Sequence, residues 1–451
     1  MTDDPARLEF GTDGLRGRAG DPPMDPATLR RIASAIGVML QGRGGERLRV
    51  VAGNDGRESG DWILGALTQG FQAAEVAVVD VGLVTTPALA CVARRHRFDA
   101  GIMISASHNA ATDNGIKIFD REGRKLSEAD EAEICALAAE VGPEVDARPR
   151  SHRRRELTDA YFDHLREAFP TLDLTGVTIA VDGANGGGSQ LVPAALGSFG
   201  ARVIATACTP DGTNINDGVG ALHPEALAPV VTGSGAALGL CLDGDGDRGI
   251  FIDDAGNVRD GDDVLALLGP DWQRRGLLPN GVVVATEMSN MGLEVALRNA
   301  GIRLLRTKVG DKYVVEAMRR ENHPLGGEQS GHIVFAGAGA HTGDGLFTAL
   351  TLLSLPQVRE GGFAAAWSTF VRFPQVLQNV EVMRKPPLDT LPGVVAARDA
   401  AAAALGDRGR VLLRYSGTEN KCRVMVEGED EAEVHRHVAN LVDAVRTALA
   451  T

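Results

Sequence analysis

Short apolar runs separated by polar turns recur along the chain in a strand, helix, strand order. In residues 49–80 an apolar run leads through a polar turn to a helical stretch over Trp62–Ala73, and then to the apolar run Val76–Asp80. Residues 177–207 and 282–308 repeat this order. Each repeat is typical of a βαβ unit, whose strands pair in parallel through a right-handed crossover. We therefore predict three related α/β domains with mixed, mainly parallel sheets.

The pattern changes in the last part of the chain. Two apolar runs, 411–415 and 422–427, flank a Ser-Gly-Thr loop and predict two strands. A helix is predicted over Pro392–Leu405, and a last amphipathic helix is indicated by apolar residues at helical spacing, namely Val434, Val438, Leu441, Val442 and Val445. This part predicts a smaller C-terminal α+β domain. The expected domains are 1–153, 154–255, 256–370 and 371–451.

Composition narrows the class of partner. The chain has 451 residues and a net charge of −14, with Arg153–Arg155 as its densest basic run, which argues against nonspecific nucleic-acid binding. Its five cysteines lack metal spacing and indicate free thiols in a reducing compartment. The charged first 20 residues do not resemble a signal peptide, and no apolar run approaches 18 residues. We expect a cytoplasmic protein that binds small molecules and neither nucleic acid nor membrane.

An alternating acidic segment is the most informative chemical feature. Residues 243–248 read Asp-Gly-Asp-Gly-Asp-Arg and follow Ala236–Leu242, an apolar run that predicts a buried strand. Curled by its glycines, the segment brings Asp243, Asp245 and Asp247 together as ligands for a hard cation such as Mg²⁺. An EF-hand loop is excluded, because Arg248 and Asp254 stand where that loop needs Gly and Glu. A solvated acidic turn stays open as the alternative.

A serine-rich turn is the second chemical feature. An apolar strand from Ile102 ends in Ser107-His-Asn, and a second strand contains Lys117. A Ser-His hydrolase dyad is not expected, because adjacent residues in an extended turn point apart. A serine that carries a phosphoryl group instead needs a cation and basic groups, which the acidic triplet and Lys117 could supply. A plain turn at a strand end is the alternative.

Further loops carry polar groups that could bind hydroxyl or phosphate groups. Residues 327–332 offer Glu328 and Ser330 beside His332, and residues 414–419 offer Arg414, the Ser416 and Thr418 hydroxyls and the Gly417 amide for a phosphate. Arg16 in a glycine-rich opening turn and Lys308 are further candidate cations. Taken singly, residues 327–332 also fit a glycine-rich turn with a buried histidine, and residues 414–419 also fit a hairpin turn.

The chain resembles the α-D-phosphohexomutase superfamily across essentially its whole length. Four motifs occur in the order typical of that family: the serine motif, the acidic motif, Gly-Glu-Gln-Ser-Gly-His and Arg-Tyr-Ser-Gly-Thr-Glu. Phe10-Gly-Thr-Asp-Gly, Met288-Ser-Asn-Met-Gly, Lys308-Val-Gly-Asp and Gln329 make the chain most similar to the bacterial phosphoglucosamine mutases. Asn54-Asp-Gly-Arg57 departs from the family's usual Arg-Asp-Thr-Arg, and we interpret it as a structural site.

The resemblance implies a heart-shaped, four-domain architecture with the active site in a central cleft. It implies that Ser107 is the phosphoserine, and that this phosphate and the three aspartates hold one Mg²⁺ per chain, with Arg248 near the phosphate. Lys117 is the first candidate for the general base, and Arg16 a supporting one. The implied substrate-binding residues are Lys308, Glu328, Ser330 and His332 for the sugar and Arg414, Ser416, Gly417 and Thr418 for the second phosphate.

The activity that the resemblance implies is an intramolecular phosphoryl transfer. Glucosamine 6-phosphate and glucosamine 1-phosphate would interconvert through glucosamine 1,6-bisphosphate, supplying amino-sugar nucleotide and peptidoglycan precursor synthesis in a monomeric or homodimeric enzyme. A mutase for phosphomannose or phosphoglucose is the nearest alternative. A non-catalytic sugar-phosphate-binding paralogue is another, which the presence of Ser107 and all three aspartates disfavours.

Overall fold

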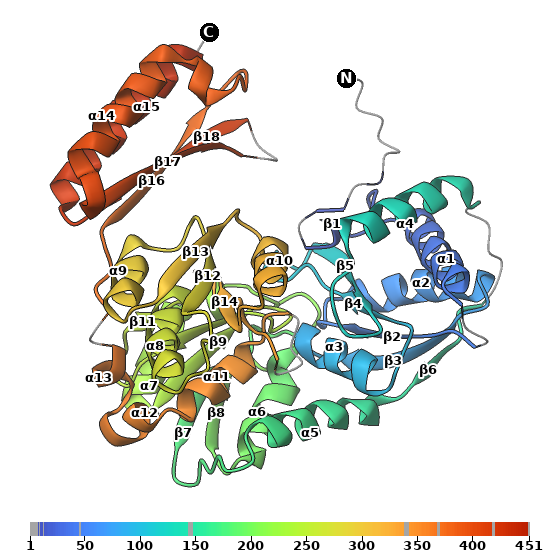
Figure 1. Ribbon diagram of the computed structural model, residues 1–451. Coiled ribbons are helices and arrows are strands. Elements are labelled where there is room, and N and C mark those ends of the chain that lie inside the picture. The colour runs from blue at the N-terminus through green and yellow to red at the C-terminus, as the bar shows by residue number, and fades with distance from the viewer. Residues whose placement is uncertain are drawn as a thin grey trace. The chain divides into compact units, whose positions relative to one another are not determined.

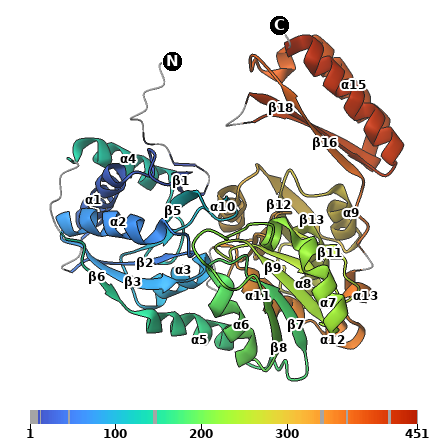
Figure 2. The same ribbon diagram turned by 180° about the vertical axis from the view of Figure 1, so that it is seen from behind.

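The computed structural model describes residues 8, 10–11, 13–44, 47–142, 148–337, 342–367, 370–416 and 420–449. The chain forms two compact units. One comprises Met1–Glu287 with Leu304–Ser368, and the other comprises Met288–Arg303 with Thr369–Thr451. Among the described residues, no helix combines the length and the apolar character needed to cross a bilayer. The first unit contains three α/β domains, each with its own sheet (Figures 1 and 2).

The first domain has a six-stranded mixed sheet in the order β1-β5-β4-β2-β3-β6. β2, β3 and β4 pair in parallel, whereas β5 runs antiparallel to its neighbours. Along β2, Val50 and Ala52 join the core with α1, α2 and α4, while Val51 lies on the other face with α3 (Figure 1). The strands are Leu15–Arg18, Arg49–Asn54, Ala77–Leu83, Ala100–Ile104, Asp113–Asp120 and Ser151–Arg153, and the helices are Pro26–Gly42, Gly60–Ala73, Thr86–Arg95 and Glu128–Glu140.

The second domain has a five-stranded sheet in the order β11-β10-β9-β7-β8. β7 pairs in parallel with β8 and β9, as the second predicted βαβ unit requires, and β10 folds back antiparallel to β9. The turn between β9 and β10 is the acidic segment. The strands are Thr178–Asp182, Arg202–Thr206, Leu238–Leu242, Gly249–Ile252 and Val258–Arg259; helix α5 (Asp159–Ala168) precedes them, and α6 (Gly188–Ser198) and α7 (Ala228–Ser234) lie between them.

The third domain has a four-stranded sheet in the order β13-β12-β14-β15. β12 pairs in parallel with β14, and β14 runs antiparallel to β15. The Gly-Glu-Gln-Ser-Gly-His segment forms the turn between β14 and β15. The strands are Val282–Thr286, Arg303–Thr307, Leu325–Gly327 and Ile333–Phe335, and the helices are α8 (Gly261–Arg274), α10 (Asp311–Glu321), α11 (Gly345–Leu353), α12 (Pro356–Gly361) and α13 (Phe363–Trp367).

The second unit is the smaller α+β domain together with helix α9 (Met291–Asn299). Its three-stranded antiparallel sheet has the order β16-β18-β17, with strands Gln375–Glu381, Gly409–Tyr415 and Lys421–Gly428. Helices α14 (Pro392–Leu405) and α15 (Glu431–Leu449) contribute Val394 and Leu441 to a core shared with Val424. The four-domain α/β and α+β class expected from the sequence is therefore confirmed.

Several helices begin at residues that satisfy their free backbone N–H groups. The Asp25 carboxylate accepts from the amides of Ala27 and Thr28, and Pro26 occupies the first turn of α1. The hydroxyl of Thr85 accepts from Ala88 at the start of α3, and the carboxylate of Asp344 accepts from Phe347 at the start of α11. These caps fix where α3 and α11 start, and both helices border the acidic turn.

Candidate active site

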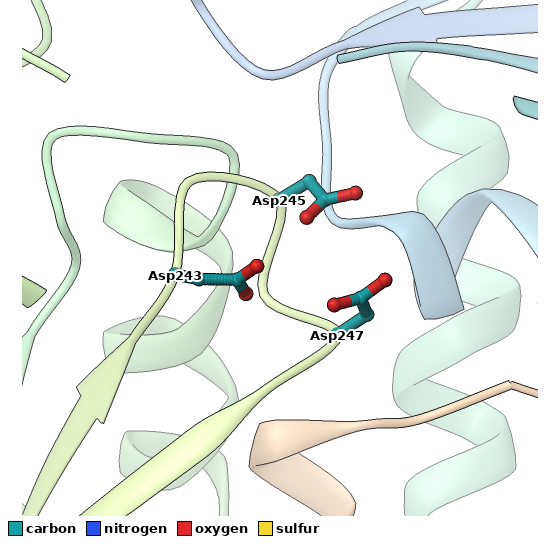
Figure 3. Close-up of side chains that lie close together, drawn as sticks. All are labelled: Asp243, Asp245 and Asp247. Carbon is teal, nitrogen blue, oxygen red and sulfur yellow. The ribbon is translucent and has the colours of Figure 1, made fainter. Parts of the chain in front are cut away.

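The acidic turn places three buried carboxylates around one space. Oxygens of Asp243, Asp245 and Asp247 lie within 4.8 Å of one another, and each residue is at most 1% exposed (Figure 3). Gly246 takes a positive φ of 68°, and a side chain on Gly244 would stand 2.5 Å from the Ser107 carbonyl oxygen. The alternation of Asp and Gly is therefore needed both for the curl of the turn and for its close approach to the serine loop.

Burial and neighbouring charges shift the pKa values of Asp243 and Asp247 in opposite directions. Burial, with the charges of Asp247 and Asp245, raises the pKa of Asp243 to about 8. Burial alone would also raise the pKa of Asp247, but Lys117 and His332 hold it well below its usual range. Asp245 Oδ1 and Asp247 Oδ1 are buried and have no hydrogen-bond partner among the described residues. Two buried oxygens without donors are a reason to expect a cation at this turn.

Lys117 supplies the positive charge nearest to the triplet. It lies on β5 of the first domain, is 1% exposed, and its Nζ is 2.7 Å from oxygens of both Asp245 and Asp247. The same Nζ is 3.0 Å from Asp13. Burial would lower the pKa of Lys117, but these three carboxylates raise it well above its ordinary value. In this arrangement the side chain is therefore an ammonium ion.

Ser107 reaches the acidic turn from the first domain. It follows β4, is fully buried, and its Oγ donates a hydrogen bond of 2.5 Å to Asp243 Oδ2. The expectation that Ser107 and His108 point apart is wrong, because Ser107 takes a φ of +53° rather than an extended conformation, which leaves its Oγ 3.4 Å from His108 Nδ1. Burial, with nearby Arg248, lowers the pKa of His108 to about 4, so this ring is neutral near pH 7.

Thr86 is a contact of the acidic turn that the sequence did not indicate. It is the first residue of α3, its Oγ1 donates to Asp245 Oδ2, and its amide donates to the Asp245 carbonyl at 2.8 Å. Asp13, which bonds Lys117 and Arg16, was also missed as an individual residue. No spacing rule links Thr86 to a turn 159 residues later.

Two arginines predicted for the site border the same region. Arg248 follows the triplet, with its Nε 4.0 Å from oxygens of Asp243 and Asp247. The Arg16 side chain, on β1, bonds Asp13, which in turn contacts Lys117. Arg16 therefore meets the triplet through Asp13 and Lys117 rather than directly.

The sugar-loop candidates lie in the third domain, and one of them, His332, lies against the triplet. His332 Nδ1 is 3.6 Å from Asp247 Oδ1, and its Nε2 accepts a 2.9 Å hydrogen bond from the amide of Gly343. Glu328 accepts from the amide of Gly310, and burial raises its pKa. Ser330 Oγ is buried without a hydrogen-bond partner in the described part of the chain. Lys308 is exposed, with its Nζ 5.9 Å from the centre of the Tyr313 ring.

The phosphate-loop candidates belong to the second unit. Arg414 is the second-last residue of β17 and lies opposite Arg423 of β18, and residues directly opposite in an antiparallel pair share a face. The Ser416 amide donates to the Lys421 carbonyl, and Lys385 Nζ donates to the Ser416 carbonyl at 2.9 Å. Gly417 and Thr418 lie outside the described residues. Arg423 and Lys385 are basic residues beside this loop that the sequence analysis did not single out.

Comparison with known proteins matches all four domains to one family. The phosphoglucomutase/phosphomannomutase models for alpha/beta/alpha domains I, II and III match residues 7–143, 159–256 and 260–368, and the C-terminal domain model matches 377–444. A phosphoglucosamine mutase of Koribacter versatilis is 43% identical, covering 99% of this chain and 98% of that protein. One of Desulfovibrio desulfuricans is 44% identical, covering 98% and 99%.

Solved structures share the fold at lower sequence identity. A phosphoglucomutase/phosphomannomutase family protein of Burkholderia thailandensis superposes with a TM-score of 0.79 at 24% identity, over 98% of each chain. Aspergillus fumigatus N-acetylphosphoglucosamine mutase, in complex with GlcNAc-6P and magnesium, superposes with a TM-score of 0.66 at 18% identity, over 98% of this chain and 96% of that one. The resemblance inferred from four motifs is thus confirmed: the chain belongs to the phosphoglucomutase/phosphomannomutase family of α-D-phosphohexomutases and, within it, to the phosphoglucosamine mutases.

Proposed function

We propose that this chain interconverts glucosamine 6-phosphate and glucosamine 1-phosphate, with Ser107 carrying the transferred phosphoryl group. The observation that supports this most strongly is the 2.5 Å hydrogen bond from Ser107 Oγ to Asp243, within a triplet of buried carboxylates. A serine placed there can carry a phosphate only if positive charge neutralises the site. The family is one of isomerases, and the curated relatives compared above are phosphoglucosamine mutases over nearly their full lengths.

The reaction is proposed as two phosphoryl transfers in opposite directions. The phosphoryl group leaves Ser107 Oγ for O1 of glucosamine 6-phosphate; the O1 proton passes to a base, and Ser107 Oγ takes up a proton. The resulting glucosamine 1,6-bisphosphate reorients within the site. Its 6-phosphoryl group then returns to Ser107 Oγ, whose proton passes to the base, and O6 takes up a proton, which gives glucosamine 1-phosphate. Such transfers depend mainly on positioning and on charge stabilisation.

The acidic turn fits a magnesium ion. It offers carboxylate oxygens, two of which, Asp245 Oδ1 and Asp247 Oδ1, accept no hydrogen bond from the described residues, and Mg²⁺ prefers such ligands together with phosphate oxygens. Asp243, Asp245, Asp247 and the phosphate on Ser107 would hold the ion. Once bound, it would neutralise charge on the group in transfer.

Basic side chains of the chain itself complete the proposed charge balance. Arg248 lies close to Asp243, the residue that Ser107 Oγ contacts, and is proposed to contact the transferred phosphate. Lys117 is proposed as the general base, with Arg16 supporting it through Asp13. The base role requires a neutral amine when O1 reacts. In the present arrangement the pKa of Lys117 is high, so the amine is charged. Lys117→Ala and Lys117→Arg therefore test whether this side chain acts as the base.

Two sets of residues are proposed to recognise the substrate. The sugar would be bound by Glu328, Ser330, His332 and Lys308. The buried Ser330 hydroxyl makes no hydrogen bond to the described residues and could bond a sugar hydroxyl. Arg414, Ser416, Gly417 and Thr418 would bind the phosphate that is not in transfer. Two recognition sets suit a bisphosphate that must be held in either orientation.

A substrate panel tests the proposal. Glucosamine 6-phosphate, glucose 1-phosphate and mannose 1-phosphate are assayed in parallel with Mg²⁺ and a catalytic amount of the matching 1,6-bisphosphate. Preference for glucosamine 6-phosphate supports the proposal, and preference for a neutral hexose phosphate replaces it with a phosphoglucomutase or phosphomannomutase activity. If none of them is turned over and intact mass shows that Ser107 is unphosphorylated, the chain would be a non-catalytic binding paralogue.

The proposed product supplies amino-sugar nucleotide and peptidoglycan precursor synthesis. Cys91, Cys208, Cys241 and Cys422 are free thiols, which supports the proposed cytoplasmic setting.

A further inference from the structure

Four carbonyl groups, three in the loop that carries Ser107 and one at the start of β5, accept hydrogen bonds from one buried arginine. Arg57 Nη2 donates to the carbonyls of Ser107 at 3.0 Å and Asn109 at 2.8 Å. Its Nη1 donates to the carbonyls of Ala110 and, at 3.0 Å, Asp113. Arg57 is 3% exposed. One side chain therefore holds the loop over its whole length.

The remaining donor of Arg57 fixes the direction of the guanidinium group. Its Nε donates to Asp55 Oδ2 at 2.9 Å, and both side chains of this ion pair are fully buried. A guanidinium group has five N–H donors, and each of them here has an acceptor. The same Asp55 oxygen accepts from Ser105 Oγ at 2.6 Å, and Ser105 Oγ accepts from the Ser107 amide at 2.8 Å. Both backbone groups of Ser107 are thus bonded to this network.

A second side chain holds two of the same carbonyls from another domain. Asn216, in the loop after β8 of the second domain, donates through Nδ2 to the carbonyls of Ser107 at 2.9 Å and Asn109 at 3.0 Å. The Ser107 and Asn109 carbonyls therefore accept hydrogen bonds both from Arg57 of the first domain and from Asn216 of the second. The acidic turn belongs to the same domain as Asn216.

The backbone of Ser107 explains why so many hydrogen bonds meet there. Its φ of +53° lies in the left-handed region, which is unfavourable for a residue with a side chain and persists only where the surroundings hold it in place. This conformation aims Ser107 Oγ at Asp243 Oδ2, 2.5 Å away. An extended backbone at Ser107 would turn the hydroxyl elsewhere.

We infer that Arg57 and Asn216 are positioning residues, which hold Ser107 in its left-handed conformation so that its Oγ meets the acidic turn of the second domain. The inference rests on the proposed function, because it assigns a role in phosphoryl transfer by Ser107. Neither side chain needs to touch the sugar. Residues 54–57, interpreted from the sequence as a structural site, would on this inference also position the reacting serine.

Asn216→Gly tests the inference without adding backbone strain. Asn216 has a φ of +58°, which glycine adopts freely, so this variant loses the two hydrogen bonds and little else. Asn185→Gly is the matched control. Asn185 is in the same domain, has a φ of +48°, and also makes two side-chain hydrogen bonds, to the Thr209 amide and the Asn214 carbonyl, away from the serine loop.

The expected result is a loss of rate without a loss of substrate affinity. Asn216→Gly should lower kcat by roughly 10- to 100-fold, because small misplacements of reacting groups have effects of that size. The KM for glucosamine 6-phosphate and the melting temperature should match those of Asn185→Gly. Equal kcat values for the two variants would overturn the inference. Asn216→Asp is isosteric and turns a donor into an acceptor facing two carbonyls, so it should lose at least as much.

A separate readout distinguishes this inference from the proposed function. Wild type and both glycine variants are incubated with Mg²⁺ and glucose 1,6-bisphosphate, and the rate of phosphorylation of Ser107 is followed by intact mass. Slow loading of Asn216→Gly alone supports the positioning role even if glucosamine phosphates prove to be poor substrates. Equal loading of all three proteins contradicts that role, whichever sugar the enzyme prefers.

Discussion

At the scale of single residues, the hydroxyl of Ser107 connects the serine loop to the acidic turn. Ser107→Ala removes the proposed phosphate carrier and one proposed metal ligand, so mutase activity should fall at least about 10³-fold. Mg²⁺ binding, measured by isothermal titration calorimetry on phosphorylated wild type and on the variant, should weaken because the phosphate is absent.

A remote serine provides the control for this substitution. Ser198→Ala removes a hydroxyl that donates to the Ala195 carbonyl within helix α6, and it should keep activity and Mg²⁺ affinity. Activity retained by Ser107→Ala would exclude Ser107 as the phosphate carrier. The triplet would then need another phosphorylated partner.

The proton on Asp243 makes metal binding depend on pH. With a pKa raised to about 8 by burial and by Asp247 and Asp245, this carboxyl is mostly protonated at pH 7, whereas a metal ligand must be ionised. Mg²⁺ affinity should therefore rise by about tenfold per pH unit between roughly pH 6 and 8, and level off above that range. Calorimetry in buffers with different ionisation enthalpies should detect about one proton released per ion bound near pH 7.

Asp243→Asn removes the titrating group and is the control. The variant should bind Mg²⁺ more weakly and release no proton on binding near pH 7. Proton release that persists in Asp243→Asn would assign the titration to another group of the site.

At the scale of elements, local sequence pattern predicts most of what the structure contains. The helix predicted over Pro392–Leu405 has those bounds, and the strand predicted over Ala236–Leu242 is β9, Leu238–Leu242. Apolar spacing and turn residues act within one element, so a single sequence is enough to read them. Four short motifs at strand ends likewise suffice to locate the triplet and Ser107.

Contacts between distant segments account for what the sequence could not predict. Arg57 bonds carbonyls 50 to 56 residues away, and Asn216 bonds carbonyls 109 and 107 residues earlier. Carbonyl acceptors belong to every residue and leave no trace in the side-chain pattern. The positive φ of Ser107 was missed for a related reason, because only the packed loop stabilises it.

Helix α11 begins at a buried carboxylate with two partners. Asp344 Oδ1 accepts from the Phe347 amide at 2.9 Å, and Oδ2 accepts from Tyr161 Oη of helix α5 at 2.7 Å. Asp344→Ala removes the cap and leaves a buried tyrosine hydroxyl unpaired, so it should lower the free energy of unfolding by roughly 2–4 kcal/mol. Asp344→Asn keeps a capping oxygen and a polar neighbour for Tyr161, and should cost less. Denaturant unfolding near pH 7 measures both.

The pH dependence of stability gives an independent check on Asp344. Burial raises its pKa from 3.8 to about 6, so between these values the folded state binds more protons than the unfolded state. Its contribution to stability is therefore present at low pH and declines as the pH rises through about 4 to 6. The stability of wild type relative to Asp344→Asn should fall over this window. A difference that does not change with pH would contradict the raised pKa.

At the scale of the whole molecule, a ring of lysines, carboxylates and one histidine joins the three α/β domains of the first unit. Lys117 contacts Asp247, Asp247 lies 3.6 Å from His332, and His332 lies 3.5 Å from Asp311. Lys125 bonds both Asp311 and Asp13, and Asp13 returns to Lys117 at 3.0 Å, which closes a ring. The first domain supplies three members, the second one and the third two. The charges that hold the proposed site together therefore also hold these domains together.

Two lysines that bridge the first and third domains allow a direct test of this ring. Lys125 contacts two carboxylates and is 18% exposed, whereas Lys312 Nζ lies 2.8 Å from Glu128, whose side chain is 74% exposed. Breaking a buried pair leaves uncompensated charge, so Lys125→Met should lower the free energy of unfolding by roughly 3 kcal/mol. Lys312→Met should cost only about 0–1 kcal/mol, because solvent already screens its pair. Both are measured as the first transition in denaturant unfolding, since a chain of several domains need not unfold in one step. If both substitutions lowered the free energy of unfolding by the same small amount, apolar packing rather than the ring of charges would hold these domains together.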